Sequence, residues 1–489
     1  MLCFLGLFIQ LNNIQIVKAH ALSGSPNNPR VIQVSRNDPR GDILSSDGIV
    51  LASSVPSSNG YYKYQRVYNP YTAVLFSQIV GFDSIIYGKT GIEAEYNSYL
   101  QSHTRPAKTL GDLLTSRTTT GNVTLTISSK LQAEVSQAVN ATNANGRAPV
   151  AGAVVINVKS GAIEAMYSNP PYDPTLLASP NIATEKFTYA SFINNPAQPL
   201  LSRTFQAGFA PGSTFKTVTS SAVYDHQPAL AKVDYPVAGC ISLEPQSNQP
   251  LCNYGHGNEK CGGVLTVTLP ASCNTAFAQI GMSLGGATLT QEAQAFGFNQ
   301  IPPIDLPGAD ASTFPAGPTF NLPSSKPFQA YAAFGQGSNV VGTALQMALV
   351  ADGIANRGVI MTPHLMRDIH DTAGNLLAQY QPKSWLTATN PLTATAVTSL
   401  MQQVVSNPIG TAYTVGFPAA WNVAAKTGTA ETGPNQSLTN DWMIAFAPAN
   451  NPKVAVAVVV PNQPADQTGA STSGPPMKTI LGDALAETP

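Results

Sequence analysis

The chain has 489 residues, of which 25 are basic and 26 acidic, so only 10% are charged and the net charge is −1. An ordinary globular protein carries roughly 25% charged residues. The low net charge and the 43% hydrophobic content exclude a chain that is disordered by composition, and the missing basic excess excludes nucleic acid as a partner. The length allows two or three domains of roughly 100 to 200 residues each.

The N-terminal segment carries no charge before Lys18. A helix that crosses a bilayer needs roughly 20 apolar residues, whereas only residues 1–9 are continuously apolar here. The segment also lacks the basic start and the small-residue cleavage site of a secretory signal. We expect residues 1–19 to be a membrane anchor whose beginning is missing from the sequence, with a buried or interfacial helix as the alternative.

Residues 20–148 are rich in turn signals, and they predict a small, irregular domain. Toward its end, residues 123–127 alternate as in a short strand. Residues 128–139 then favour a helix with Ser128 as its N-cap.

Residues 149–489 predict a second and larger domain. Two apolar runs, 151–158 and 162–166, are joined by Lys159-Ser160-Gly161, which favours a β-hairpin. Helices are expected over 215–224 and 342–355. Three strand-like runs, 421–425, 441–447 and 453–460, then follow in the manner of an antiparallel meander. Strands at both ends with helices between them predict an α+β domain whose first and last strands share one sheet.

Four of the five cysteines lie close together in the sequence: Cys240, Cys252, Cys261 and Cys273. Zinc sites usually use cysteine pairs with two intervening residues, and these gaps are much longer. If this region is exported, disulfides are the expected use. Four cysteines allow three pairings, and we prefer Cys240 with Cys252 and Cys261 with Cys273. The six histidines are scattered without metal spacing, so no metal is expected.

Ser213 and Lys216 stand three residues apart at the start of a predicted helix, so their side chains share one face. A neutral lysine can take the proton of an attacking serine, and free N–H groups at a helix N-terminus favour developing negative charge. Lys216 is the only one of the 15 lysines with a serine three residues before it. The alternative is a capping serine beside a solvated lysine. It becomes less favoured only if the sequence also contains partner groups for Ser213 and Lys216.

Two further motifs supply such partners. Lys426-Thr427-Gly428 follows a strand-like run, and a second lysine near Lys216 would help to keep that amine neutral. Ser272-Cys273-Asn274 is the only Ser-x-Asn triplet between the two lysines. Ser272 could relay a proton to a leaving group, Asn274 could hold Lys216 and a substrate amide, and Thr427 could bind a substrate carboxylate.

The ordered set Ser-x-x-Lys, Ser-x-Asn and Lys-Thr-Gly resembles the penicillin-binding proteins and serine β-lactamases. Residues 211–216 look like the nucleophile segment of the class B penicillin-binding proteins, which are monofunctional peptidoglycan D,D-transpeptidases. The similarity extends from about residue 30 to about residue 460, including Gly335-Gln336-Gly337. Ser-Cys-Asn as the second motif is most like the actinobacterial PbpA subgroup.

The resemblance implies a transpeptidase domain, an antiparallel sheet sandwiched by helices, preceded by a smaller, irregular, mostly β pedestal domain. It implies that Ser213, deprotonated by Lys216, attacks the carbonyl between the two terminal D-alanines of a stem peptide and releases D-alanine. An amine of a neighbouring stem then attacks the acyl-enzyme. The resemblance places the oxyanion hole at the backbone N–H groups of Ser213 and Thr429, and substrate contacts at Thr427 and Gly428. No cofactor is implied.

The resemblance also implies partners and a location. The partners are stem peptides, β-lactam antibiotics, a glycosyltransferase and proteins of the division or elongation machinery. The chain is expected at the cell membrane, anchored by its N-terminus with its bulk outside the cytoplasm, in septal or polar wall synthesis.

Two rival functions would keep the same motifs. A serine β-lactamase needs a base that activates water; after Asn274 the only glutamates are Glu292, Glu431 and Glu487, and the surroundings of Glu292 lack the expected pattern. Glu431 follows the Lys-Thr-Gly run and could approach the cleft, but we favour its interpretation as a solvated side chain. A penicillin sensor or divisome scaffold with little turnover is the second rival, although no cytoplasmic signalling segment is recognisable.

Overall fold

The computed structural model describes residues 36–57, 62–104, 118–141, 150–243, 250–255, 257–337, 339–432 and 436–488. The predicted anchor, residues 1–19, lies outside them. The chain forms two compact units, each built from several stretches of sequence. Unit 1 takes residues 1–125, 172–196 and 366–380, and unit 2 takes residues 126–171, 197–365 and 381–489.

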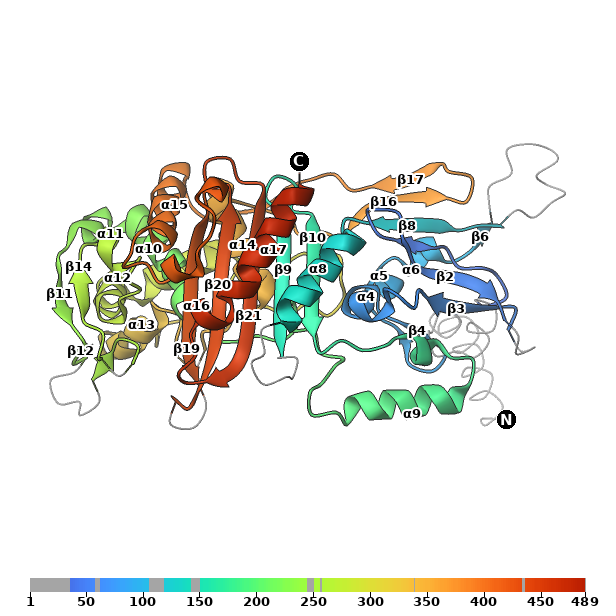
Figure 1. The fold of residues 1–489 in the computed structure, drawn as a ribbon, viewed down its shortest axis with the longest axis horizontal. Helices are drawn as coiled ribbons and strands as arrows, with labels where there is room; N and C mark the ends of the chain where they lie inside the picture. Colours follow the sequence, from blue (N-terminus) through green and yellow to red (C-terminus); the bar gives the residue numbers. More distant parts are fainter. Residues whose placement is uncertain are drawn as a thin grey trace, which may run out of the picture. The chain divides into compact units, whose positions relative to one another are not determined.

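Unit 1 is organised around a six-stranded sheet in the order β17-β16-β8-β1-β2-β3 (Figure 1). β1 and β8 pair in parallel, whereas the other neighbours are antiparallel. Among its described residues, the unit also contains helices. The bounds are β1 (Ile43–Leu44), β2 (Val50–Pro56), β3 (Tyr64–Tyr68), β8 (Gly121–Leu125), β16 (Met366–Asp371), β17 (Leu376–Gln379), α4 (Ala73–Val80), α5 (Gly91–Glu95), α6 (Asn97–Leu100) and α9 (Ile182–Ile193).

A buried ion network ties the sheet of unit 1 to α5. Glu93 on α5 accepts from Arg40 Nε at 2.7 Å and from Arg66 Nε at 2.5 Å. The Glu93 side chain is fully buried, and the arginine side chains are 8% and 1% exposed. Removing one partner from such a network leaves the other charges buried without compensation. Each of the three side chains is therefore needed to compensate the buried charge of the others.

Unit 2 contains a five-stranded antiparallel sheet in the order β10-β9-β21-β20-β19. α8 and α17 pack together on one face, and α14 covers the other (Figure 1). Most of β20 and β21 is buried, which explains their long apolar runs. The bounds are β9 (Ala151–Asn157), β10 (Ile163–Asn169), β19 (Ala424–Thr432), β20 (Leu438–Ala447), β21 (Val454–Pro464), α8 (Ser129–Asn140), α14 (Ala344–Ala355) and α17 (Gly474–Glu487).

A mostly helical part of unit 2 lies beside β19. It consists of a short 3-10 helix η3, longer helices, and two small β-hairpin pairs, β11 with β14 and β12 with β13. The bounds are η3 (Gly212–Phe215), α10 (Lys216–His226), α11 (Leu265–Thr268), α12 (Asn274–Ala295), α13 (Lys326–Ala332), α15 (Pro391–Ser406), α16 (Gly469–Thr472), β11 (Tyr235–Ala238), β12 (Cys240–Ile241), β13 (Leu251–Cys252) and β14 (Cys261–Gly263).

Several local predictions are confirmed. The expected hairpin is β9-β10, and the expected meander is β19-β20-β21, which joins it in one sheet. Ser128 caps α8, because its Oγ accepts from the N–H of Leu131. One strand boundary is wrong: the run predicted as 421–425 is β19, which begins at Ala424 and continues to Thr432. The Lys-Thr-Gly motif therefore lies inside a strand rather than after it.

The structural units do not follow the predicted boundary at residues 148 and 149. α8 belongs to unit 2, because its apolar face packs against β10 and α17. Residues 366–380 belong to unit 1, because β16 pairs with β8 over five residue positions. Residues 172–196 carry α9 into unit 1 as well. Long-range pairing of this kind leaves no signal in the composition of the linking segments.

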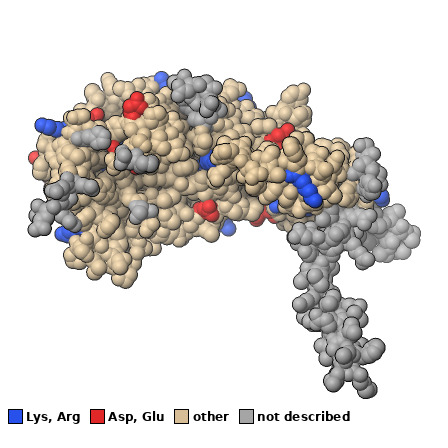
Figure 2. Space-filling model, turned by 90° about the horizontal axis from the view of Figure 1, so that it is seen from below, with Lys and Arg blue, Asp and Glu red and all other residues tan. Residues whose placement is uncertain are grey.

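Two observations concern the sequence-based expectations about nucleic acid and about the membrane. Figure 2 shows single, scattered charges on the visible face of the molecule and no basic patch there. Within the described ranges, no helix has both the length and the apolar composition that a bilayer crossing requires.

Replacing Glu93 by Gln is expected to destabilise unit 1 by about 3 kcal/mol or more, because Arg40 and Arg66 then stay buried without their counter-charge. Denaturant unfolding followed by a probe in unit 1 measures the change. The control is Arg367→Gln, which removes a pair that is 48% exposed on its arginine side and should change little. Equal stability of Glu93→Gln and wild type would contradict the role given to the network.

Candidate active site

A cleft of about 750 Å³ in unit 2 brings the three sequence motifs together. Ser213 comes from η3, Ser272 and Asn274 from the start of α12, and Thr427 and Thr429 from β19. These elements are far apart in the sequence and converge only in the folded unit.

Ser213 is partly exposed to the cleft, whereas its neighbours Gly212 and Thr214 are buried. Gly212 has a φ of 52°, and its N–H donates to Gly335 O at 3.0 Å. A Cβ on Gly335 would lie 2.0 Å from Gly212 O. The two backbones touch, so the nucleophile segment rests directly on the Gly335-Gln336-Gly337 turn.

Both lysines of the motifs are fully buried and point at the same hydroxyl. Lys426 Nζ donates to Ser272 Oγ at 2.9 Å, and Lys216 Nζ donates to it at 3.3 Å. Lys216 Nζ also donates to Ser272 O at 2.6 Å and to Asn274 Oδ1 at 2.7 Å. Ser272 thus connects the two amines.

The environment of the two amines favours their neutral forms. Burial, and then the nearby Lys426, lowers the pKa of Lys216 well below its usual value. Burial lowers the pKa of Lys426 to about 7. The rings of Phe277 and Phe334 lie 5.2 and 5.7 Å from Lys216 Nζ and form the apolar wall behind it. A neutral Lys216 can accept a proton from a nearby hydroxyl.

β19 forms the opposite wall of the cleft. Thr427 Oγ1 lies 2.5 Å from Thr411 Oγ1, and Thr429 Oγ1 accepts from the N–H of Gly469 at 3.0 Å. A Cβ on Gly428 would lie 2.7 Å from Pro211 O and 2.9 Å from the Thr214 side chain. The glycine of the motif therefore lets the strand pack directly against the segment that carries the nucleophile.

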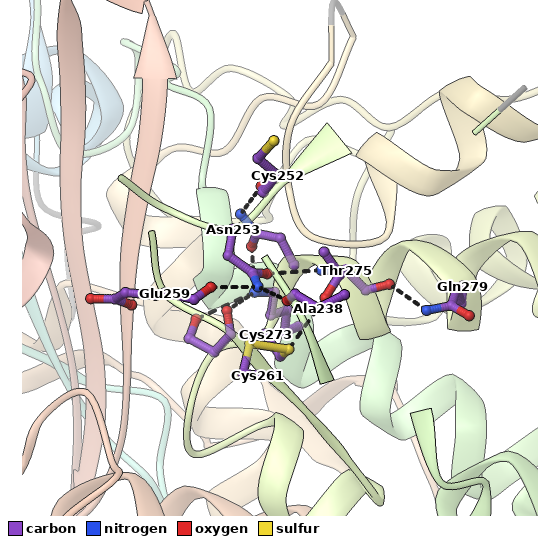
Figure 3. The surroundings of a disulfide bond; sticks show 11 residues. Ala238, Cys252, Asn253, Glu259, Cys261, Cys273, Thr275 and Gln279 are labelled. Atoms are coloured by element: carbon purple, nitrogen blue, oxygen red, sulfur yellow. Dashed lines mark hydrogen bonds between the residues drawn. A yellow bond between two sulfur atoms is a disulfide. The ribbon is translucent and has the colours of Figure 1, made fainter. Parts of the chain in front are cut away.

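Two disulfides stabilise the loop region next to the second motif, with the preferred pairing of the cysteines. Cys240–Cys252 links β12 to β13, and Cys261–Cys273 links β14 to the residue before α12 (Figure 3). Cys273 is buried between Ser272 and Asn274 in the chain. Ser272 adopts a φ of 57°, a conformation that costs energy for a non-glycine residue and often occurs at functional sites. The covalent link thus holds a strained catalytic segment.

Asn253 provides a second connection in the same region (Figure 3). Its side-chain amide donates to Ala238 O at 2.8 Å and to Glu259 O at 3.0 Å. Its Oδ1 accepts from the N–H of Thr275 at 3.0 Å. The start of α12 is therefore held by hydrogen bonds as well as by a disulfide. The sequence did not single out Asn253, since a lone asparagine in a loop carries no specific signal.

The glutamates occupy different places. Glu292 does not line the cleft; its Oε2 lies 3.1 Å from His226 Nε2, and burial, with a contribution from Asp225, raises its pKa to about 9. Glu431, in contrast, lines the cleft and is half-buried, which agrees with the approach to the cleft that the sequence left open. The available signal was the strand period: Thr427, Thr429 and Glu431 alternate along β19 and share one face.

The arrangement is suited to acyl transfer through a serine. A partly exposed hydroxyl, a buried neutral amine and a hydroxyl that bridges two amines are the groups that such a reaction requires. Within the described residues, no three His, Cys, Asp or Glu side chains gather in a way that could hold a metal ion.

Comparisons with known proteins agree with this chemistry. Residues 151–482 match a family described as the penicillin binding protein transpeptidase domain, and residues 40–123 match the penicillin binding protein A dimerisation domain. The chain is 34% identical to the peptidoglycan D,D-transpeptidase PbpA of Mycolicibacterium smegmatis, over 97% of this chain and 94% of that protein. It is also 34% identical to PbpA of Mycobacterium tuberculosis H37Rv, over 99% of this chain and 96% of that protein.

Solved structures of penicillin-binding protein A have a similar fold. The ceftriaxone acyl-enzyme of penicillin-binding protein A from M. tuberculosis superimposes with a TM-score of 0.80 at 30% identity, covering 93% of this chain and all of that one. The penicillin G acyl-enzyme of the same protein gives a TM-score of 0.79 at 31% identity, covering 91% of this chain and 99% of that one.

The low pKa of Lys426 makes stability depend on pH. An unfolded lysine keeps its proton up to about pH 10.4, whereas folded Lys426 releases it near pH 7, so the unfolded chain binds more protons between these values. The free energy of unfolding therefore rises with pH in this window. Below pH 7 the penalty for burying the charged amine is complete, and above about pH 10.4 it has gone.

Replacing Lys426 by Met removes this dependence. From pH 7 to pH 10 the wild type should gain stability relative to Lys426→Met by up to about 1.4 kcal/mol per pH unit, measured as the difference in free energy of unfolding of unit 2. The exposed Lys383→Met is the control and should run parallel to the wild type. A constant difference between Lys426→Met and the wild type would show that Lys426 is protonated throughout.

Proposed function

The chain belongs to the penicillin-binding proteins with a transpeptidase domain, and we propose that it cross-links peptidoglycan as a D,D-transpeptidase with Ser213 as the nucleophile. The observation that carries the assignment of roles is the pair of buried lysines, both bonded to Ser272 Oγ in the cleft that Ser213 lines. The class B and PbpA-like resemblance is confirmed by the relatives, and so is the α+β fold class.

The first half of the reaction forms the acyl-enzyme. Neutral Lys216 accepts the Ser213 proton as Oγ attacks the carbonyl between the two terminal D-alanines. The C–N bond then breaks, and the leaving amine of D-alanine takes a proton from Ser272 Oγ. Ser272 regains a proton from Lys216, to which it is already hydrogen-bonded. A β-lactam opens by the same attack, and its leaving group stays attached to the acyl chain.

Backbone donors and one hydroxyl would position the substrate. The N–H groups of Ser213 and Thr429 would face the carbonyl oxygen, and each such donor is worth roughly 100- to 1,000-fold in rate. β19 is an edge strand in the described sheet, so half of its N–H groups point away from β20. Thr427 would bind the terminal carboxylate, and Gly428 allows the strand to approach the nucleophile.

Both rival functions find less support. A β-lactamase needs a base for the deacylating water, and Glu292 is bonded to His226 outside the cleft. A sensor or scaffold would not need two buried amines with lowered pKa values around one relay hydroxyl.

The anchor and the partner proteins belong to the same proposal. We propose that residues 1–19 attach the chain to the membrane, with its bulk extracytoplasmic; the uncharged stretch 1–17 supports this. Stem peptides reach the cleft on glycan strands, so a glycosyltransferase must supply the substrate. We propose that the chain works beside one in the division or elongation machinery, and crosslinking in intact membranes would test this.

Fluorescent penicillin tests the nucleophile. Wild type should be labelled stably, Ser213→Ala should not be labelled, and Lys216→Ala should be acylated at least about 100-fold more slowly, because a general base is lost. The exposed Ser283→Ala is the matched control and should behave as wild type. Persistent labelling of Ser213→Ala would remove Ser213 from the mechanism, and rapid turnover of penicillin by the wild type would favour the β-lactamase.

Membrane flotation tests the anchor. The full chain should float with phospholipid vesicles, and a chain that begins at residue 20 should stay at the bottom of the gradient while retaining penicillin labelling, because unit 2 is untouched. Flotation of the shortened chain to the same extent as the full chain would place membrane attachment elsewhere.

A further inference from the structure

The second half of the proposed reaction requires an amine at the acyl-enzyme. A free alkyl amine on a stem peptide has a pKa of about 10.4 and is therefore an ammonium ion at neutral pH. A cleft that receives this group gains from a negative charge near the acyl carbonyl, because opposite charges attract strongly where water is partly excluded. The three motifs supply no such charge: their ionisable groups are two lysines.

Glu431 supplies a carboxylate at a suitable place. It follows Thr429 by two residues on β19, so the two side chains share the cleft face and are separated by about 6.8 Å of strand rise. Thr427 lies at the same spacing on the other side of Thr429. Along one edge strand, the cleft therefore has a hydroxyl, an oxyanion residue and a carboxylate in order.

The negative charge of Glu431 acts on two tyrosines from different parts of the fold. Burial is the main cause of the raised pKa of Tyr254 and Tyr331, and the negative charge of Glu431 adds to both shifts; for Tyr254, Asp441 contributes more than Glu431 does. The charge of Glu431 therefore affects the hydroxyl groups of both tyrosines. The Tyr254 hydroxyl donates to Ala465 O at 2.7 Å, which holds its ring at the cleft wall. The cleft therefore offers an ammonium ion both a carboxylate and the ring of Tyr254.

An adjoining groove provides space for the rest of an incoming peptide. It has a volume of about 440 Å³ and includes Phe320, Phe328 and Tyr331 in its lining. Gln336 lines both the groove and the cleft, so the two spaces meet at this residue. The junction lies on the turn that supports the nucleophile segment.

We propose that Glu431 is the acceptor-binding residue: it holds the ammonium group of the incoming stem peptide beside the Ser213 acyl-enzyme. The inference rests on the proposed transpeptidase function and deepens it. The ammonium group first loses one proton to water. The neutral nitrogen then attacks the ester carbonyl, its second proton passes to Ser213 Oγ through Lys216, and the C–O bond breaks as the amide forms. Glu431 itself is unchanged.

The experiment separates acylation from amine transfer with Glu431→Gln. The donor is a peptide that ends in D-Ala-D-Ala, and the acceptor is a peptide with a free side-chain amine. We expect the KM for the acceptor to rise at least about tenfold, since an attractive charge at the binding site is lost. The rate of acylation by penicillin should stay within about twofold of wild type. Glu431→Asp should recover part of the acceptor affinity.

Two controls test whether the rise in acceptor KM comes from the loss of the Glu431 charge. Hydroxylamine is an uncharged nucleophile at neutral pH, so its transfer should be the same in wild type and Glu431→Gln. Glu134→Gln, which neutralises a carboxylate on α8 outside the cleft, should leave acceptor KM unchanged.

Three results would overturn the inference. The first is an unchanged acceptor KM in Glu431→Gln. The second is an equal loss with hydroxylamine and with the cationic acceptor, which would indicate a structural effect. The third is slower hydrolysis of the acyl-enzyme without any amine, which would make Glu431 a base for water. Failure of the wild type to form a Ser213 acyl-enzyme would instead overturn the proposed function.

Discussion

The structure of the cleft depends on the burial of two lysine amines around one serine hydroxyl. Lys216 and Lys426 are both fully buried, and both donate to Ser272 Oγ. Two charged ammonium groups could not share this space without water, because desolvation and mutual repulsion both oppose charge. Burial and the neighbouring Lys426 therefore lower the pKa of Lys216, which favours the neutral form that can accept a proton. The tight contact between β19 and η3 keeps the segments that carry these groups close together.

Close backbone contacts and covalent links maintain that arrangement. Gly335 and Gly428 let neighbouring backbones approach Gly212 and Pro211 at distances that no side chain would allow. On the other side of the cleft, Cys261–Cys273 and the hydrogen bonds of Asn253 hold the start of α12, where Ser272 takes a strained conformation. A flexible loop would lose the geometry that lets one hydroxyl bridge two amines, since proton transfer needs donor and acceptor within hydrogen-bond reach.

Much of the site could be predicted from the sequence because its chemistry is written in short motifs. Three ordered motifs identified Ser213, Lys216, Ser272, Asn274 and Lys426, and the structure brings all five into one region. The position of Glu431 stayed open, because the predicted strand ended before Lys426 and did not include the alternation that places this side chain at the cleft. The interleaving of the two compact units was not predicted, because the pairing of β16 with β8 joins segments more than 240 residues apart.

The sequence by itself determined which groups are available and which local elements present them: the caps, the hairpin, the meander and the spacing of each motif follow from neighbouring residues. Only the tertiary structure decided that the two lysines are buried together, that Cys273 is paired with Cys261, and that Glu431 lines the same cleft as Ser213. The physical reason is that pKa values, disulfide pairing and cleft lining depend on contacts between distant segments. Such contacts arise from packing in three dimensions, and local residue patterns do not encode them.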